Sequence, residues 1–496
     1  MSLKKQLGKS TAWMGLAASG MSVVSFLVFI VISRILSPSE IGLAVFAILV
    51  VEVGKVIINA GLTQSIVQRI DWNQEYSSTC FALNVIGGVL FTALIWLVGV
   101  PLTREFYSPA AVPVLQALSI IFLIEAVKVV HEGKMRREFL FKTIALRTIV
   151  ASLISGVVGV TLALNGYGVW ALVAQQIVGH VLVSAITLYS ANWWPTLMLK
   201  YSLVKEALNF SGPLMVAQLI NTLSTTIMDF MVGIILGPVA LAVFRIAGRS
   251  LFILQDIIVR PFEHTALPVL ARMKDKIERA NATVRLIRLS NFIIVPIFFG
   301  ASAVASDFIV AAFGVKWQTS GDLMTLLAIG SAPLLIRFQI NAALIAEGAS
   351  RWVMTSTVLT LLLAFTLGYF GIPYGLTYSA LTYVAINYGA SVISLISFKY
   401  VFQASITPVL KAILPSYIAS SLMLAACILM KMSLPSDLNS PVRILILCAT
   451  GGITYIALAA FIFRTETKNF LHEALSLAPA KISPLLIRLQ ALLKLA

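Results

Sequence analysis

The sequence predicts an all-α polytopic membrane protein of about 14 transmembrane helices, in two six-helix lobes followed by two extra C-terminal helices. Two observations support this fold class. The chain is 59% hydrophobic and only 11% charged, and its mean hydropathy is +0.96. Its apolar segments also reach the roughly 20 residues that one membrane-spanning helix needs.

The predicted helices follow one another with short connections. Hydropathy places them at residues 12–32, 41–65, 77–98, 112–130, 143–163, 168–190, 208–235, 239–259, 290–312, 323–345, 352–370, 375–398, 412–430 and 444–463. The first six form the predicted N-lobe, residues 1–198, and the next six the C-lobe, residues 199–402. Residues 403–496 then hold two more helices and an amphipathic cytoplasmic tail.

The positive charge is arranged by topology. The net charge is +16, and 26 of the 36 lysines and arginines lie in, or within a few residues of, one alternating set of connections. The opposite set holds five and the helices hold five. This bias places both termini in the cytoplasm by the positive-inside rule. The lysines and arginines form no basic face, so we expect no nucleic-acid partner.

The chain contains an internal repeat. The segment Arg34–Phe46, with its Ile-Leu-Ser-Pro turn, reappears as Ile234–Phe244, with Ile-Leu-Gly-Pro. The loop that begins at Phe106 has a weaker echo at Phe313. Six helices separate the copies, so both copies enter the membrane from the same side. We therefore expect the lobes to be related by an axis along the membrane normal, with substrate near the midplane between them.

Two predicted helices each carry an acid and a lysine. Glu52 and Lys55 lie in the second helix, and Glu125 and Lys128 lie in the fourth. Residues spaced i,i+3 share one helix face. Each pair is therefore either a structural ion pair or a pair that exchanges partners when a ligand or an ion arrives.

Three arginines lie inside predicted helices of the C-lobe. Arg245 and Arg249 are spaced i,i+4, and Arg337 lies two helices further on. A charge at the bilayer centre costs about 2.5–3.5 kcal/mol, and Asp229 is the one clear acid available there. The surplus indicates an anion-binding cavity, because guanidinium groups match phosphate oxygens. The alternative is that these arginines snorkel to the membrane surface.

Signals for an enzyme are missing. There is no HExxH motif, no P-loop and no long exterior loop. The cysteines have no metal-binding spacing, so we expect no metal and no cofactor. His180, in the predicted sixth helix, is interpreted as a satisfied bundle histidine rather than a proton relay.

Four segments resemble a known family. They are Ile32–Leu43, Asn59–Arg69, the Phe106-Tyr-Ser-Pro turn and Asn165–Leu172. Together they are similar to the bacterial polysaccharide flippases of the Wzx type, in the multidrug/oligosaccharidyl-lipid/polysaccharide exporter superfamily. The resemblance covers essentially the whole chain. It implies fourteen helices, a cavity open alternately to each side, and a substrate of oligosaccharide linked to undecaprenyl pyrophosphate.

The expected function is therefore that of an inner-membrane flippase for exopolysaccharide, capsule or O-antigen assembly. The site residues come from the charge argument. Those expected to bind pyrophosphate are Arg245, Arg249, Arg337, Lys55 and Lys128. Those expected to couple transport to protons or sodium are Glu52, Glu125 and Asp229.

The expected partners are membrane lipids and a lipid-linked oligosaccharide, with a polysaccharide polymerase and chain-length proteins as further candidates. Two alternatives remain open from the sequence. One is a multidrug cation exporter of the same superfamily, and the other is a membrane enzyme of polysaccharide assembly.

Overall fold

The protein is all-α, as its sequence predicts. The computed structural model describes residues 22–59, 61–69, 71–196, 198–435, 438–464, 467–468 and 470–471, and these residues contain helices and no strand. Two predicted segments lie outside the described residues. They are the start of the first predicted helix and most of the predicted tail, including its amphipathic part.

Twelve helical segments of the described chain are long and apolar enough to cross a membrane. They are Pro38–Gln68, Gln74–Phe106, Pro109–Arg137, Phe141–Leu164, Val169–Ala191, Tyr201–Leu270, Lys276–Phe313, Val315–Ala346, Ser350–Tyr374, Leu376–Phe402, Thr407–Ser433 and Ser440–Phe461. A shorter apolar helix, Ser22–Ile35, precedes them. Tyr201–Leu270 (α10) is 70 residues long and contains a break. The exact count of fourteen helices is not confirmed.

Contacts within the chain define two compact units, Met1–Arg245 and Ile246–Ala496. The division falls within α10, at a position different from the lobe boundary expected at residue 198. The lobes of the sequence analysis therefore stay a prediction.

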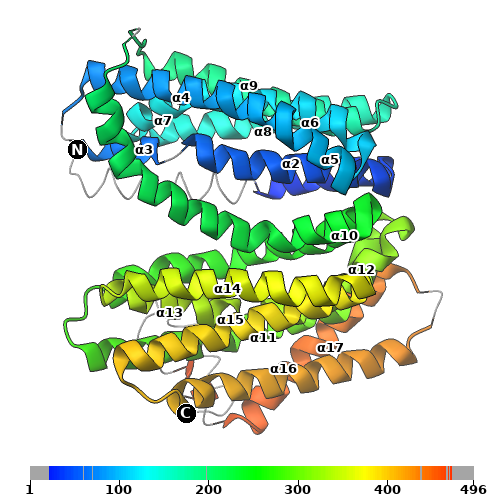
Figure 1. Ribbon diagram of the computed structural model, residues 1–496. Helices are drawn as coiled ribbons and strands as arrows, with labels where there is room; N and C mark the ends of the chain where they lie inside the picture. The colour runs from blue at the N-terminus through cyan, green and yellow to red at the C-terminus, as the bar shows by residue number, and fades with distance from the viewer. Residues whose placement is uncertain are drawn as a thin grey trace. The chain divides into compact units, whose positions relative to one another are not determined.

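In the unit Met1–Arg245, the helices pack as antiparallel neighbours (Figure 1). This unit contains α2 (Pro38–Asn59), α3 (Leu62–Gln68), α4 (Gln74–Leu94), η1 (Ile95–Gly99), α5 (Val100–Phe106), η2 (Pro109–Ala111), α6 (Val112–Leu118), α7 (Ile120–Arg137), α8 (Phe141–Leu164) and α9 (Val169–Ala191). Helix α8 packs along α9, and α7 contacts both α4 and α9. Leu115, Phe122 and Val173 are buried where α6, α7 and α9 meet.

The unit Ile246–Ala496 is built around α11. It contains α11 (Lys276–Phe313), η3 (Val315–Trp317), α12 (Gln318–Ser331), α13 (Leu334–Ala346), α14 (Ser350–Gly371), η4 (Ile372–Tyr374), α15 (Leu376–Phe402), α16 (Thr407–Ser433) and α17 (Ser440–Phe461). Helix α11 contacts α12, α16 and α17, while α14 packs along α15 (Figure 1).

The order of elements repeats between the two units. A short helical turn, two helix segments and a helix pair follow one another as η2–α6–α7–α8–α9 and again as η3–α12–α13–α14–α15. The membrane-spanning segment before each series, Gln74–Phe106 in one and Lys276–Phe313 in the other, begins with the same kind of cap. The Asn73 side chain accepts from the Tyr76 backbone N–H, and the Asp275 side chain accepts from that of Glu278, both at 2.8 Å. The duplication seen in the sequence thus extends to local structure.

The first copy of the repeated turn starts α2 with a capping box. Pro38 occupies the first helical position, where its missing N–H is no loss. The Glu40 carboxylate accepts from the Ser37 backbone N–H at 2.8 Å and from the Ser37 hydroxyl at 2.7 Å. These bonds satisfy donors that a helix N-terminus leaves unpaired.

The second copy of the turn breaks α10. Gly237 has φ 84° and ψ −176°, a conformation that is essentially restricted to glycine. A helix cannot continue through such a residue, so the backbone of α10 changes direction there. The residues on the two sides of Gly237 can therefore face one another.

Near its start, α2 contacts this break closely. A Cβ atom at Gly42 would collide with the backbone of Pro238. The Tyr107 hydroxyl donates to the Gly42 carbonyl at 2.8 Å, and its ring stacks on Phe46 with centroids 3.9 Å apart. Burial raises the pKa of the Tyr107 phenol, so the hydroxyl keeps the proton that it donates. The two copies of the repeated turn are thus packed together within one unit.

Candidate functional site

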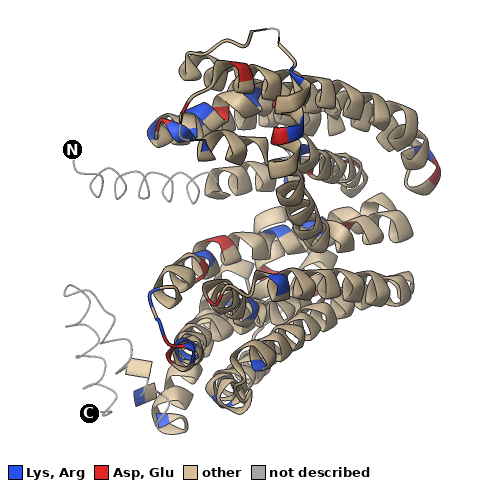
Figure 2. Cartoon of the chain, turned by 60° about the vertical axis from the view of Figure 1, so that its left-hand side comes forward, with Lys and Arg blue, Asp and Glu red and all other residues tan. Residues whose placement is uncertain are grey.

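Few positions on the helices carry charge (Figure 2). Charges inside apolar spans are costly unless they have ionic partners. The charged side chains of the spans are therefore the candidates for a functional site. The predicted site residues fall into both units. Lys55, Lys128 and Arg245 belong to the unit Met1–Arg245, and Arg249 and Arg337 belong to the unit Ile246–Ala496.

Arg245 forms an ion pair with Asp229. One of its terminal guanidinium nitrogens donates to Asp229 Oδ2 at 2.6 Å, and Asp229 is only 8% exposed. Along an uninterrupted helix, 16 residues span about 24 Å, so the break at Gly237 is what brings the two side chains together. Glu52 of α2 acts electrostatically on both of them. Arg245 is therefore a partnered cation, next to a second acid.

Glu125 is the centre of a second ionic group. Its Oε1 atom accepts from Lys128 Nζ at 2.7 Å and lies 2.7 Å from Nδ1 of His180. Glu125 is 3% exposed. Lys55 of α2 acts electrostatically on His180. The pair expected from the spacing of Glu125 and Lys128 is present, and a histidine from α9 joins it.

The other expected pair does not form. Within the described chain, Glu52 and Lys55 are not within ion-pair distance of each other. Glu52 interacts instead with the Asp229–Arg245 pair, and Lys55 with the group around Glu125. Helix α2 thus presents one charge to the Asp229–Arg245 pair and one to the group around Glu125.

Arg337 differs from Arg245 and Lys128. It is half-buried on α13, in the span Val315–Ala346. In the most apolar stretch of that span, 72% of the residues are buried within the structure. Its guanidinium carbon lies 5.5 Å from the ring centroid of Phe338. Among the described residues, no carboxylate lies within ion-pair distance of it. Glu263 and Tyr383 act on it electrostatically from a longer range.

Arg249 is also half-buried, in the part of α10 that belongs to the unit Ile246–Ala496. Its guanidinium carbon lies 5.5 Å from the ring centroid of Phe252. A cation over an aromatic face gains electrostatic stabilisation. Both predicted site arginines of this unit, Arg249 and Arg337, therefore lie near phenylalanine rings.

One ionic group was not found by sequence reasoning. Asp307 of α11 is 6% exposed. Its carboxylate pairs with Lys431 of α16 at 2.8 Å and with Arg443 of α17 at 3.1 Å. More than a hundred residues separate the aspartate from its partners, so helix spacing could not identify them. The group ties the two additional C-terminal helices to α11.

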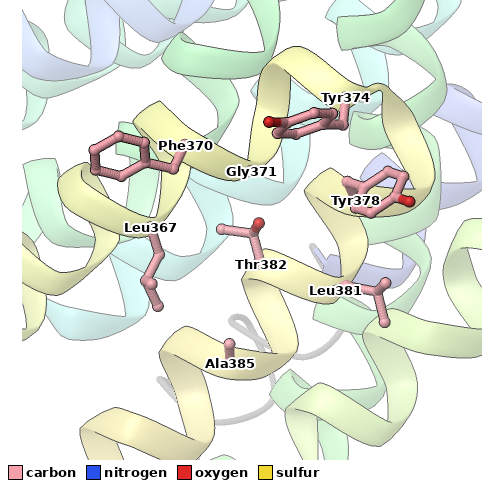
Figure 3. Close-up of a pocket in the computed structure, with 8 residues that line it drawn as sticks. All are labelled: Leu367, Phe370, Gly371, Tyr374, Tyr378, Leu381, Thr382 and Ala385. Carbon is pink, nitrogen blue, oxygen red and sulfur yellow. The ribbon is translucent and has the colours of Figure 1, made fainter.

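A surface pocket lies at the junction of α14, η4 and α15 (Figure 3). It has a volume of about 430 Å³ and is lined by aromatic and aliphatic side chains, including Phe370, Tyr374 and Tyr378. None of its lining residues is charged. It is therefore not a site for the phosphate groups that the arginines were predicted to bind.

In the described part of the chain, no three His, Cys, Asp or Glu side chains form a group that could hold a metal ion.

Comparison with solved structures establishes the class of protein. The lipid II flippase MurJ, in an inward closed conformation, has a TM-score of 0.75 to this chain at 14% identity. The match covers 91% of this chain and 99% of MurJ. Together with the apolar helices, this shows a multi-pass membrane protein with the fold of that transporter.

Sequence comparison then gives the family. Residues 31–322 match the family of polysaccharide biosynthesis proteins, and the chain belongs to it. ExoT, the succinoglycan biosynthesis transport protein of Rhizobium meliloti (strain 1021), is 24% identical over 332 residues, which are 66% of this chain and 67% of ExoT. WzxC, a lipopolysaccharide biosynthesis protein of Escherichia coli (strain K12), is 22% identical over 340 residues, which are 66% of this chain and 68% of WzxC. The resemblance to the Wzx-type family is thereby confirmed.

Proposed function

We propose that this protein is a flippase that moves undecaprenyl-pyrophosphate-linked oligosaccharide units across the bacterial inner membrane by alternating access. The units would serve exopolysaccharide, capsule or O-antigen assembly. Relatives named for succinoglycan transport and lipopolysaccharide biosynthesis support this substrate class. The likeness to a lipid II flippase supports the fold that such transport needs.

One observation carries the proposal. Arg337 is a permanent cation on a largely buried apolar span, and no carboxylate of the described chain is within ion-pair distance of it. Such a charge is costly unless an anion compensates it. A guanidinium offers a planar fork of donors that fits two phosphate oxygens at once. The pyrophosphate of the lipid carrier supplies such oxygens.

The remaining cations are proposed to bind the pyrophosphate with Arg337. They are Arg249, Lys55, Arg245 and Lys128, of which Arg245 and Lys128 must first exchange a carboxylate for the phosphate. The acids released in this exchange, together with Glu52, are the proposed sites for proton or sodium coupling. They are Asp229 and Glu125.

The charge distribution also argues against the alternatives. A cavity with surplus arginine repels cationic drugs, and this disfavours a multidrug cation exporter. The connections between helices are short and carry no catalytic motif, which favours transport over enzymatic polymerisation or cleavage.

The positive-inside pattern favours an orientation with both termini in the cytoplasm. Membrane lipids surround the protein in this proposal. A polysaccharide polymerase and chain-length proteins are the proposed partners that receive the exported unit.

Arg337→Ala tests the proposal in a strain that lacks its own flippase for this substrate. We expect export of the polysaccharide to be lost while the variant is still inserted in the membrane. The substitution removes the guanidinium that has no carboxylate of the described chain within ion-pair distance. Arg337→Lys should restore part of the export, since it keeps the charge and loses the fork. Arg351→Ala removes an exposed arginine of the same unit and serves as the matched control.

The measurement is polysaccharide yield normalised to the amount of inserted protein. Full export by Arg249→Ala, by Arg337→Ala and by the double variant would show that these arginines do not bind the substrate, and would overturn the proposal.

A further inference from the structure

Two donors share one oxygen atom of Glu125. Lys128 Nζ and His180 Nδ1 both lie 2.7 Å from Oε1, and the side chains of Glu125, Lys128 and His180 are 4%, 11% and 18% exposed. Neither donor bonds to the second carboxylate oxygen in the structure. The lysine and the histidine therefore compete for the same negative charge.

Among the described residues, the charged groups that act on His180 besides Glu125 are the cations Lys55 and Lys128. Helix α7 contributes Glu125 and Lys128, and Lys55 of α2 acts on the imidazole. Helix α6 carries no titratable residue. Helix α8 contributes Arg147, which bonds to Thr187 further along α9 and pairs with Glu132. Glu125 is thus the carboxylate of the described chain that acts on this histidine.

The charge of the group depends on the histidine. With His180 neutral, Glu125 and Lys128 cancel, and the lysine is retained by the carboxylate. A proton on His180 makes the donor cationic while the acceptor is already anionic, so its hydrogen bond to Glu125 becomes an ion pair and is strengthened. The imidazolium can then satisfy Glu125 alone, and Lys128 becomes free to bind another anion.

We propose that His180 is a proton-operated switch that releases Lys128 from Glu125 and so makes the lysine available to the pyrophosphate of the substrate. This rests on the proposed function and deepens it, since it names the proton as the coupled ion and gives its binding atom, a ring nitrogen of His180. Histidine suits the role because its ordinary pKa lies near 6.5, so its charge changes between about pH 5 and 8. One proton taken up corresponds to one cation made available.

The proposed switch predicts the direction in which anion binding depends on pH. Binding of an anion should be stronger at low pH, where His180 is charged. By linkage, binding of the anion must raise the proton affinity of His180 by the same factor. Inorganic pyrophosphate itself becomes less negative as the pH falls, which weakens its attraction to cations and acts in the opposite direction.

The test measures inorganic pyrophosphate binding to the full-length protein in lipid nanodiscs at pH 6 and pH 8, without divalent metal. The wild-type protein should bind roughly tenfold more tightly at pH 6, a factor within the usual range of coupling between two sites. Calorimetry in buffers of different ionisation enthalpy should show proton uptake on binding. His180→Gln, which keeps a neutral donor, should bind as the wild type does at pH 8 and lose this pH dependence and this proton uptake.

Two further variants complete the experiment. Lys128→Gln should bind weakly at both pH values. His264→Gln, which alters an exposed histidine of α10, should behave as the wild type.

The two proposals fail in distinguishable ways. If His180→Gln binds pyrophosphate with the wild-type pH dependence and proton uptake, the switch is overturned and the anion site stands. If the wild type and all variants bind no pyrophosphate at either pH, the anion site of the proposed function is overturned as well.

Discussion

At the scale of single residues, the ionisable side chains within the apolar spans differ in how they are neutralised. Arg245 is paired with Asp229 and Lys128 with Glu125, whereas Arg337 has no carboxylate within ion-pair distance in the described chain. Removing one partner of a buried pair leaves the other charge uncompensated, which costs about 3–5 kcal/mol. The paired residues are therefore expected to affect stability directly, and Arg337 is the residue proposed to bind the ligand.

Asp229→Asn should lower the free energy of unfolding by about 3 kcal/mol, because the amide keeps the shape of the carboxylate and loses its charge. Thermal unfolding in nanodiscs measures the effect. Asp71→Asn alters an exposed acid of the same unit and should leave the Tm unchanged. An Asp229→Asn variant with the wild-type Tm would show that the pair with Arg245 contributes nothing to stability.

At the scale of helices, one backbone position determines the geometry of the site. Gly237 interrupts α10 with φ 84°. This break places Arg245 against Asp229 and brings Pro238 against Gly42 of α2. A residue with a Cβ atom is strained in this conformation, by about 1–3 kcal/mol.

Gly237→Ala should therefore destabilise the protein and weaken the Asp229–Arg245 pair. The matched control is Gly212→Ala in the same helix. A Cβ atom at Gly212 meets no neighbouring atom, and alanine is favoured over glycine in a helix by about 1 kcal/mol. We expect the Tm to fall for Gly237→Ala and to stay equal or rise for Gly212→Ala. The opposite order would contradict the role assigned to the break.

At the scale of the whole molecule, the chain consists of two compact units in which one order of elements is repeated, and the second unit also contains α16 and α17. The additional helices are held to α11 by the group formed by Asp307, Lys431 and Arg443. Since one buried carboxylate serves two cations from two helices, its removal acts on both contacts at once.

Asp307→Asn should loosen α16 and α17 from α11, because both cations lose their counter-charge. Hydrogen exchange of the amides in these two helices should increase more than that of α14 and α15. Asp322→Asn, an exposed acid on α12, is the control and should not change the pattern. Unchanged protection of α16 and α17 in Asp307→Asn would mean that apolar packing alone holds them.

Much of the fold could be predicted because helix formation in apolar segments is local. The segments predicted at residues 143–163 and 168–190 are observed as α8, Phe141–Leu164, and α9, Val169–Ala191. The Glu125–Lys128 pair was also accessible, since i,i+3 neighbours share a helix face. The ion pairs of Asp307 and the contact between His180 and Glu125 could not be predicted, because they depend on which helices become neighbours.

The amino-acid sequence alone predicts a bundle of apolar helices with an internal repeat and an excess of arginine within those helices. A helix satisfies its backbone hydrogen bonds within its own segment, so composition and periodicity suffice to predict it. The tertiary structure decided which charges neutralise one another. Ion pairs form over a few ångströms between side chains of different helices, and only the packing of those helices places Arg245 on Asp229, brings His180 to Glu125 and leaves Arg337 without a carboxylate at ion-pair distance in the described chain.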